Sequence, residues 1–274
     1  MADWKKKVLV AIPSYKRADK DITQNLVNAT GLNKEFTVKT FVYSFDPQLE
    51  DYKKIPGINL QIIPNCFVDK ANLARKRNYI LDYAIHNGYE YLFQMDDDID
   101  FIGRYNDLRS FIVKSIELCR TTSELAVVSP AIEATRYLRN GEIEHDAVTH
   151  STALMDLYRI GDIRYIEDTK CEDASFCLSV FENKLRTVKL NSIVIHNKDA
   201  AREGEYEEGG LGYKYLENGI SADKKAEYER QGLIEEHPFL YENGITYLDD
   251  NGILRINHEK LEEFRGGFLD GENN

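Results

Sequence analysis

Apolar and polar positions alternate along the first hundred residues in blocks that predict an α/β fold. Val8–Pro13 is a continuous apolar run, which is the pattern of a strand covered on both faces. The further elements predicted here are a helix carrying Ile22, Leu26 and Val27 and capped by Asp19 or Asp21, strands at Phe36–Phe45 and Ile58–Ile63, an amphipathic helix at Asp69–His86 ending near Gly88, and a strand at Tyr91–Met95. This order favours a mostly parallel central sheet flanked by helices.

The second half continues the pattern and then changes character. Its predicted elements are a helix at Leu108–Cys119, a strand at Leu125–Ile132, a hairpin turning at Asn140-Gly141, a helix at Glu172–Phe181 and a strand at Leu185–Ile195. Arg202–Tyr215 is rich in Glu and Gly and is either a surface loop or a lid. Beyond it we expect a helix at Ser221–Gln231, a hairpin at Ile245–Ile256 and a helix at His258–Phe264. We therefore expect one domain over residues 1–200, with a flexible loop or lid and a smaller C-terminal α+β extension over 201–274 packed on it.

The stretch Tyr91–Asp100 joins an apolar run to four carboxylates within five residues. A plain reading is a solvated acidic loop after a strand. Hard divalent cations, however, take oxygen ligands, often carboxylates together with phosphate oxygens of a substrate. Ligands of parallel sheets bind at the carboxyl ends of the strands. Arg17, Asp46 and Asp96–Asp98 all follow predicted strand ends, so one crevice can collect them.

Composition narrows the class of protein. The 274 residues contain 42% hydrophobic residues, as expected for a chain that buries a core, and carry a net charge of −12. That charge argues against a uniformly basic nucleic-acid face but is compatible with a local basic patch. The four cysteines, Cys66, Cys119, Cys171 and Cys177, show no paired zinc spacing and fit a reducing compartment. No signal-like or membrane-spanning run is found, so we expect a soluble, cytoplasmic protein (in the host cytoplasm if phage-encoded) with no membrane partner.

Several motifs follow one another in a familiar order. They are Val8–Arg17 (VLVAIPSYKR), Asn72–Asn78 (NLARKRN), Tyr91–Asp100 (YLFQMDDDID), Glu172-Asp173 before a helix, and Ile193–His196 (IVIH). Over residues 7 to 200 the chain thereby resembles the GT-A-fold glycosyltransferases, most closely those of the family-2 type. The resemblance implies a Rossmann-like GT-A domain that transfers a sugar from a nucleotide diphosphate sugar, usually a UDP-sugar, to a hydroxyl acceptor with Mn²⁺ or Mg²⁺.

The resemblance also implies roles for individual residues. The metal ligands are Asp96, Asp98 and His196, although the sequence leaves open which of the three adjacent aspartates ligate. The nucleotide-sugar contacts are Pro13, Tyr15, Arg17, Asp46, Arg77, Asp96 and Asp97. Tyr15 offers an aromatic face for a base, Arg17 and Arg77 offer charge to a diphosphate, and Asp97 suits a ribose hydroxyl equally well. The segment around Asp46 lacks the usual run of acidic and small residues.

Glu172 and Asp173 match the catalytic pair of the family. In inverting members the Asp takes the proton of the acceptor hydroxyl, so Asp173 is the expected base. The pair Glu167-Asp168, five residues earlier, remains a rival. His145 and His150 remain alternatives to His196.

The acceptor is the least determined feature. The chain weakly resembles phage-type glycosyltransferases that act on hydroxymethylated pyrimidines in DNA, and a small basic patch is available from Lys70, Arg75, Lys76, Arg77, Arg136 and Arg139. Glycan and protein acceptors remain open, as do the sugar and the oligomeric state.

Two other classes of protein also remain open. A sugar nucleotidyltransferase should carry a glycine-rich loop, which Pro13–Arg17 lacks; a non-catalytic cation-binding interaction module would bind metal without turning over UDP-sugar.

Overall fold

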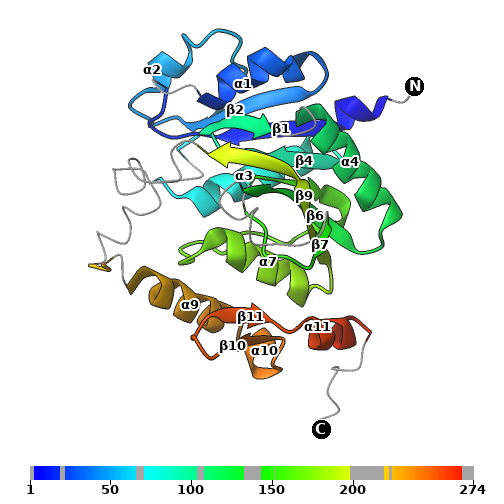
Figure 1. Ribbon diagram of the computed structural model, residues 1–274. Helices are drawn as coiled ribbons and strands as arrows, with labels where there is room; N and C mark the ends of the chain where they lie inside the picture. Colours follow the sequence, from blue (N-terminus) through cyan, green and yellow to red (C-terminus); the bar gives the residue numbers. More distant parts are fainter. Residues whose placement is uncertain are drawn as a thin grey trace.

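A nine-stranded sheet forms the centre of the molecule (Figure 1). The computed structural model describes residues 3–18, 22–65, 71–103, 108–132, 143–150, 152–197, 219–221 and 224–266. The sheet contains β1 (Val8–Pro13), β2 (Thr37–Tyr43), β3 (Leu60–Ile63), β4 (Tyr91–Gln94), β5 (Ile99–Gly103), β6 (Leu125–Ile132), β7 (Ile143–His145), β8 (Ala153–Asp156) and β9 (Arg186–Asn197). The strand order is β3-β2-β1-β4-β8-β6-β9-β5, and β7 pairs with β9.

The sheet is mostly parallel, which confirms the predicted fold class. Strands β3, β2, β1 and β4 run parallel to one another, and β6 runs parallel to β9. Strand β8 is inserted antiparallel between β4 and β6, and β5 is antiparallel to β9. Neither β8 nor β5 is predicted from the sequence. The arrangement brings the carboxyl ends of β1, β2, β4, β6 and β9 to the same edge as the first residues of β8 and β5.

Both faces of the sheet are covered, as the unbroken apolar run of β1 requires. Val8, Val10 and Ile12 point to the face covered by α1 (Ile22–Thr30) and α4 (Leu108–Thr121). Leu9 and Ala11 point to the opposite face, covered by α3 (Leu73–His86), α6 (Leu157–Ile160) and α7 (Glu172–Glu182). The remaining short elements on this part of the chain are η1 (Asp3–Lys7), η2 (Leu32–Lys34) and α2 (Leu49–Tyr52). Every residue of β1 is buried.

Helix α3 begins four residues later than predicted. The side chain of Asn72 accepts a hydrogen bond from the backbone N–H of Arg75, which is the usual N-cap contact and fixes the start at Leu73. Gly88 follows the helix with φ 73°, a conformation that glycine adopts without strain. The predicted apolar face is buried through Ala74, Arg77, Ile80, Leu81 and Ala84, whereas Ile85 is exposed.

The C-terminal elements pack on α7, which lies between them and the sheet (Figure 1). They are α9 (Lys225–Glu236), α10 (Pro238–Glu242), β10 (Thr246–Leu248), β11 (Leu254–Ile256) and α11 (His258–Arg265). Leu178 and Phe181 of α7 share one apolar cluster with Leu233, Leu240, Ile245, Leu261 and Phe264. The predicted hairpin and terminal helix are thereby confirmed, and the predicted helix at Ser221–Gln231 is present but lies further along the chain.

Some expectations fall outside the described residues. They are the caps Asp19 and Asp21, Cys66, Lys70, the hairpin at Asn140-Gly141 with Arg136 and Arg139, and the segment Arg202–Tyr215. The division at residue 200 therefore stays a prediction. Among the described residues, no helix combines the length and apolar character that a bilayer-spanning helix needs.

A buried ion pair joins α11 to the rest of the fold. Arg265, 4% exposed at its side chain, donates to both carboxylate oxygens of Asp146 at 2.8 and 2.7 Å and to the carbonyl oxygen of Leu185 at 2.6 Å. Arg186 donates to the same carboxylate at 3.3 Å. Removal of one partner from such a pair leaves a buried charge without compensation, which costs more than the pair itself contributes.

We therefore expect Arg265→Met to lower the free energy of unfolding by about 3 kcal/mol, the lower end of the usual range because Arg186 still faces Asp146. Urea denaturation measures this loss. Arg255→Met is the matched control, since Arg255 pairs with Asp249 at the surface and is 51% exposed. Equal, small effects of both changes would contradict this account of how the C-terminal elements are attached.

Candidate active site

The acidic turn Asp96–Asp98 lies at the edge where the parallel strands end. It connects β4 to β5 and is held by α1: Thr23 donates its hydroxyl proton to the carbonyl oxygen of Asp96 at 2.7 Å, and its hydroxyl oxygen accepts the N–H of Ile99 at 2.9 Å. The backbone N–H of Thr23 also donates to the carbonyl oxygen of Asp97 at 3.3 Å. The turn is thus built into the fold and is not a solvated loop.

Arg77 connects this turn to α7. Its guanidinium donates to the carboxylate of Asp173 at 2.6 Å and to that of Asp96 at 3.3 Å, while only 2% of its side chain is exposed. Its charge also lies 5.5 Å from the centre of the Tyr165 ring. Burial lowers the pKa of Arg77, but the charges of Asp173 and Asp96 raise it by more, so the guanidinium stays charged. The partners of this buried arginine are therefore two carboxylates of the candidate site.

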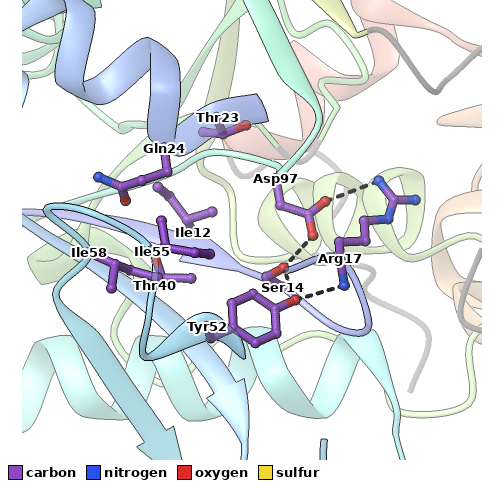
Figure 2. A pocket seen from close by; sticks show the side chains of 10 residues that line it. All are labelled: Ile12, Ser14, Arg17, Thr23, Gln24, Thr40, Tyr52, Ile55, Ile58 and Asp97. Atoms are coloured by element: carbon purple, nitrogen blue, oxygen red, sulfur yellow. Dashed lines mark hydrogen bonds and ion pairs between the residues drawn. The ribbon is translucent and has the colours of Figure 1, made fainter. Parts of the chain in front are cut away.

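Arg17 connects the same turn to the loop after β1. It donates to Asp97 at 3.1 Å and to Asp98 at 3.2 Å. Ser14 donates to the other oxygen of Asp97 at 2.6 Å, and the Tyr52 hydroxyl is 2.6 Å from the Ser14 hydroxyl and accepts the N–H of Arg17 at 2.9 Å (Figure 2). These groups form one wall of a pocket of about 280 Å³, partly open to solvent, whose apolar wall is Ile12, Ile55 and Ile58.

The acidic turn has the chemistry of a divalent-cation site. Burial and the neighbouring charges of Asp96 and Asp97 raise the pKa of Asp98 to about 7, and burial raises that of Asp97. Asp98 is 7% exposed, and among the described residues no group hydrogen-bonds to its buried Oδ1. Crowded carboxylate oxygens with an unused acceptor fit a hard cation. In the part of the chain described, however, no three His, Cys, Asp or Glu side chains already converge as a ligand set.

The loops after β1 and β2 form an aromatic cluster beside the turn. Tyr15 packs edge-on against Tyr43 and Phe45, with ring centres 5.9 and 6.5 Å apart, and Tyr43 stacks on Phe45 at 4.8 Å. Pro13 is the buried last residue of β1 and pairs with Phe41 of β2. Tyr15 itself is half-buried.

Asp46 fixes the geometry of this loop. It is 4% exposed, and its two carboxylate oxygens accept the backbone N–H groups of Lys16 at 3.0 Å and Gln48 at 2.8 Å. Lys16 has φ 55°, an unfavourable backbone conformation for a residue with a side chain. The hydrogen bond to Asp46 offsets part of that cost.

Lys76 is a buried cation, and its burial, like that of Arg77, contradicts the predicted place of both residues in a basic surface patch. It is 2% exposed on α3, donates to the carbonyl oxygen of Ser14, and lies 4.2 Å from the centre of the Tyr43 ring and 5.6 Å from that of Tyr15. Burial lowers its pKa to about 7, against the opposing charges of Asp97 and Asp46. A lysine within an amphipathic helix pattern gives no signal of burial, which is why the sequence alone assigns Lys76 to the surface.

The pair Glu172-Asp173 begins α7, where the helix dipole favours carboxylates. Glu172 is 6% exposed, and the Asp173 side chain is 28% exposed and held by Arg77. Burial raises the pKa of Asp173 to about 7; Arg77 opposes this rise, and Glu172 and Asp96 add to it. The rival pair is engaged elsewhere: Glu167 accepts from Arg75 at 2.6 Å, and Asp168 accepts from Asn72 at 3.3 Å.

The histidines of this edge differ in their surroundings. His196 is half-buried in β9, opposite Phe101 of β5, the strand that begins directly after the acidic turn. His150 accepts the N–H of Thr152 at Nδ1 and so donates from Nε2 to the carbonyl oxygen of Pro130 at 3.0 Å; burial lowers its pKa to about 4. The Thr152 hydroxyl accepts the backbone N–H of Asp96 at 3.3 Å. Thr23, Tyr52 and Thr152 are further residues of this edge that no sequence motif reveals, and Ser14 lies within the first motif but is not assigned a role by it.

Comparisons with known proteins identify the family and the fold of the chain. The family described as TET-associated glycosyltransferase matches residues 8–205. No curated protein matches the chain. A mannosyltransferase from Pyrobaculum calidifontis, in complex with GDP-Man and Mn²⁺, is similar in structure at 14% identity and a TM-score of 0.51, over 88% of this chain and 74% of that one. Glucosyl-3-phosphoglycerate synthase from Mycobacterium tuberculosis, in complex with Mn²⁺ and UDP-glucose, is similar at 8% identity and a TM-score of 0.54, over 92% and 86%. At these identities the likeness shows the fold, and the expected GT-A fold is confirmed.

Proposed function

The chain belongs to the TET-associated glycosyltransferase family, and we propose that it transfers a sugar from a UDP-sugar to the hydroxyl group of a 5-hydroxymethylated pyrimidine in DNA, with Mn²⁺ or Mg²⁺ at the acidic turn. The observation that carries the proposal is the guanidinium of Arg77, which ties Asp96 of that turn to Asp173 of α7. The acidic turn would then be the donor end of a transfer site and Asp173 its acceptor end, with the buried guanidinium between them.

The residues of the donor end suit a nucleoside diphosphate. Asp96 and Asp98, with His196, would hold the cation, which when bound neutralises the negative charge that develops on the departing diphosphate. Arg17 lies beside the same carboxylates and adds a charge that suits phosphate. Tyr15 and Phe45 supply aromatic faces for the base, and Asp97 a carboxylate for a ribose hydroxyl. The synthase from Mycobacterium tuberculosis supports UDP as the nucleotide, since it binds UDP-glucose on the same fold.

The acceptor end centres on Asp173. A hydroxyl group must lose its proton as it attacks the anomeric carbon, and a base works best when its pKa lies near the working pH. The pKa of Asp173, about 7, meets that condition. Glu172, buried beside it, contributes to this value through its charge. We assign Asp173 as the base of an inverting transfer.

A hydroxymethylated base fits both the family and the chemistry. The family name and the weak resemblance to phage-type enzymes that act on such bases support this acceptor. A base inside a duplex must be extruded before its substituent can enter a site at the edge of a sheet. Because the chain carries a net charge of −12, phosphate contacts must come from local basic residues such as Arg75. A glycan or protein acceptor is the second candidate, and the following assay separates it.

The protein is incubated with Mn²⁺ and a mixture of UDP-sugars, together with single-stranded oligonucleotides that differ only in carrying 5-hydroxymethylcytosine or 5-methylcytosine. We expect mass spectrometry to detect an added hexose or N-acetylhexosamine on the hydroxymethylated strand alone, and none when Mn²⁺ is replaced by a chelator. Transfer to glycans or proteins but to neither strand would overturn the DNA acceptor. Absence of transfer and of UDP binding would overturn the transferase assignment.

Asp173→Asn keeps the shape of the side chain but removes the proton acceptor. We expect transfer to fall by about 10²–10⁴-fold while the affinity for UDP stays within about threefold. Because the pKa of Asp173 is about 7, the wild-type rate should also fall as the pH drops below that value, where the carboxylate becomes protonated. Asp168→Asn tests the rival pair. If Asp173→Asn kept the wild-type rate of transfer and Asp168→Asn lost it, the base would be Asp168.

Asp98→Ala tests the cation site. In thermal melting with UDP, the wild type should gain a further stabilisation when Mn²⁺ is added, and the variant should lose that metal-dependent part. Asp51→Ala is the control, because Asp51 pairs only with Lys54 at the surface in the described structure. A metal-dependent shift that survives in Asp98→Ala would show that the cation binds elsewhere.

A further inference from the structure

Lys76 has no role in the proposed function, although it contacts the loop after β1 that carries Ser14 and Tyr15. Its ammonium group carries three N–H donors. One of them meets the carbonyl oxygen of Ser14, and the aromatic rings of Tyr43 and Tyr15 lie at 4.2 and 5.6 Å. Among the described residues, no carboxylate lies within ion-pair distance of its Nζ atom. Burying an ammonium group without a carboxylate partner costs folding free energy, so a lysine at this position calls for an explanation.

The surroundings of Lys76 match the edge of a particular base. The ammonium contacts Ser14 and Tyr15 of the loop after β1, and the charges of two carboxylates act on it, Asp97 on the acidic turn and Asp46 after β2. A cationic donor and a carboxylate acceptor beside an aromatic cluster complement a base edge that presents a carbonyl oxygen next to an imide N–H. Uracil has such an edge, whereas cytosine presents an amino group and an unprotonated nitrogen there.

We propose that Lys76 is a specificity residue of the donor site, donating a hydrogen bond to the O4 carbonyl oxygen of uracil, where cytosine has its amino group, and so selecting UDP-sugars over donors with cytosine. This inference rests on the proposed function, because it assumes that the nucleotide binds against Tyr15. Asp46 takes the complementary position for the imide N–H; its carboxylate oxygens already accept two backbone N–H groups but have further lone pairs.

A competing explanation gives Lys76 only a structural role, as a support for the Ser14–Arg17 loop. The two explanations differ in what Lys76→Met should do. If Lys76 is only a support, its replacement should lower the melting temperature and weaken the binding of every nucleotide by the same factor. A specificity residue whose burial is costly should, when replaced by an apolar side chain of similar length, leave the melting temperature unchanged or raise it. Its loss should lower the affinity only for the nucleotide that accepts its hydrogen bond.

The experiment compares the binding of UDP and CDP by calorimetry in the presence of Mn²⁺. We expect the wild type to bind UDP more tightly, and Lys76→Met to lose about 10–100-fold of UDP affinity, the effect of one hydrogen bond to a charged group. CDP affinity should stay within about threefold. Lys39→Met is the matched control, since Lys39 also lies over a tyrosine ring, that of Tyr83 at 5.6 Å, but within β2 and not at its carboxyl end.

Each result decides between the explanations. Equal losses for UDP and CDP, or an unchanged preference for UDP in Lys76→Met, would overturn the role of Lys76 while leaving UDP as the donor nucleotide. A wild type that binds neither nucleotide, or prefers CDP, would instead overturn the proposed donor and this inference with it. Lys76→Arg, which keeps a donor on the side chain, should retain part of the preference and guards against a folding defect in the Met variant.

Discussion

The buried guanidinium of Arg77 is the interaction on which the candidate site depends. It is 2% exposed and holds one carboxylate from the sheet edge, Asp96, and one from α7, Asp173. Without it, two carboxylates at the same edge would lie near each other with Glu172 close by, and their charges would repel. With it, a helix that follows β4 by more than seventy residues is held at a defined position against that strand.

The remaining contacts of the edge follow the same logic. Three elements hold the acidic turn: α3 holds the side chain of Asp96, the loop after β1 holds those of Asp97 and Asp98, and Thr23 at the start of α1 holds the backbone of Asp96 and Asp97. Crowded carboxylates raise one another's pKa, and the two arginines limit that rise. The site is therefore rigid at its backbone but rich in negative charge, which suits the binding of a cation and, through the arginines, of a phosphate.

Much of the fold is readable from the sequence because its strands are short apolar runs. Val8–Pro13 and Leu125–Ile132 coincide with β1 and β6, since their faces are buried on both sides and no polar residue blurs their ends. Strand β8 escapes prediction because Ala153–Asp156 is only four residues long and has no turn signal, and its antiparallel direction is set by tertiary packing.

The site is readable in part for a related reason. Motif order places Arg17, Arg77, Asp96–Asp98 and Asp173 along the chain, and the parallel sheet brings them to one edge. Which side chain contacts which depends on rotamers and on residues outside the motifs, such as Thr23 and Tyr52. Lys76 is the clearest case, because its burial comes from the aromatic residues that pack around it and not from its own character.

The attachment of the C-terminal elements has a consequence for the limits of the catalytic unit. The family match ends at residue 205, yet the outer face of α7 is covered by Leu240, Leu261 and Phe264, and Arg265 adds to Arg186 as a partner of the buried Asp146 carboxylate. A chain cut where the match stops would present Leu178 and Phe181 to water on the helix that carries Asp173. The C-terminal elements thus support α7 from the side opposite the sheet, and the packed unit extends beyond the segment that the family match covers.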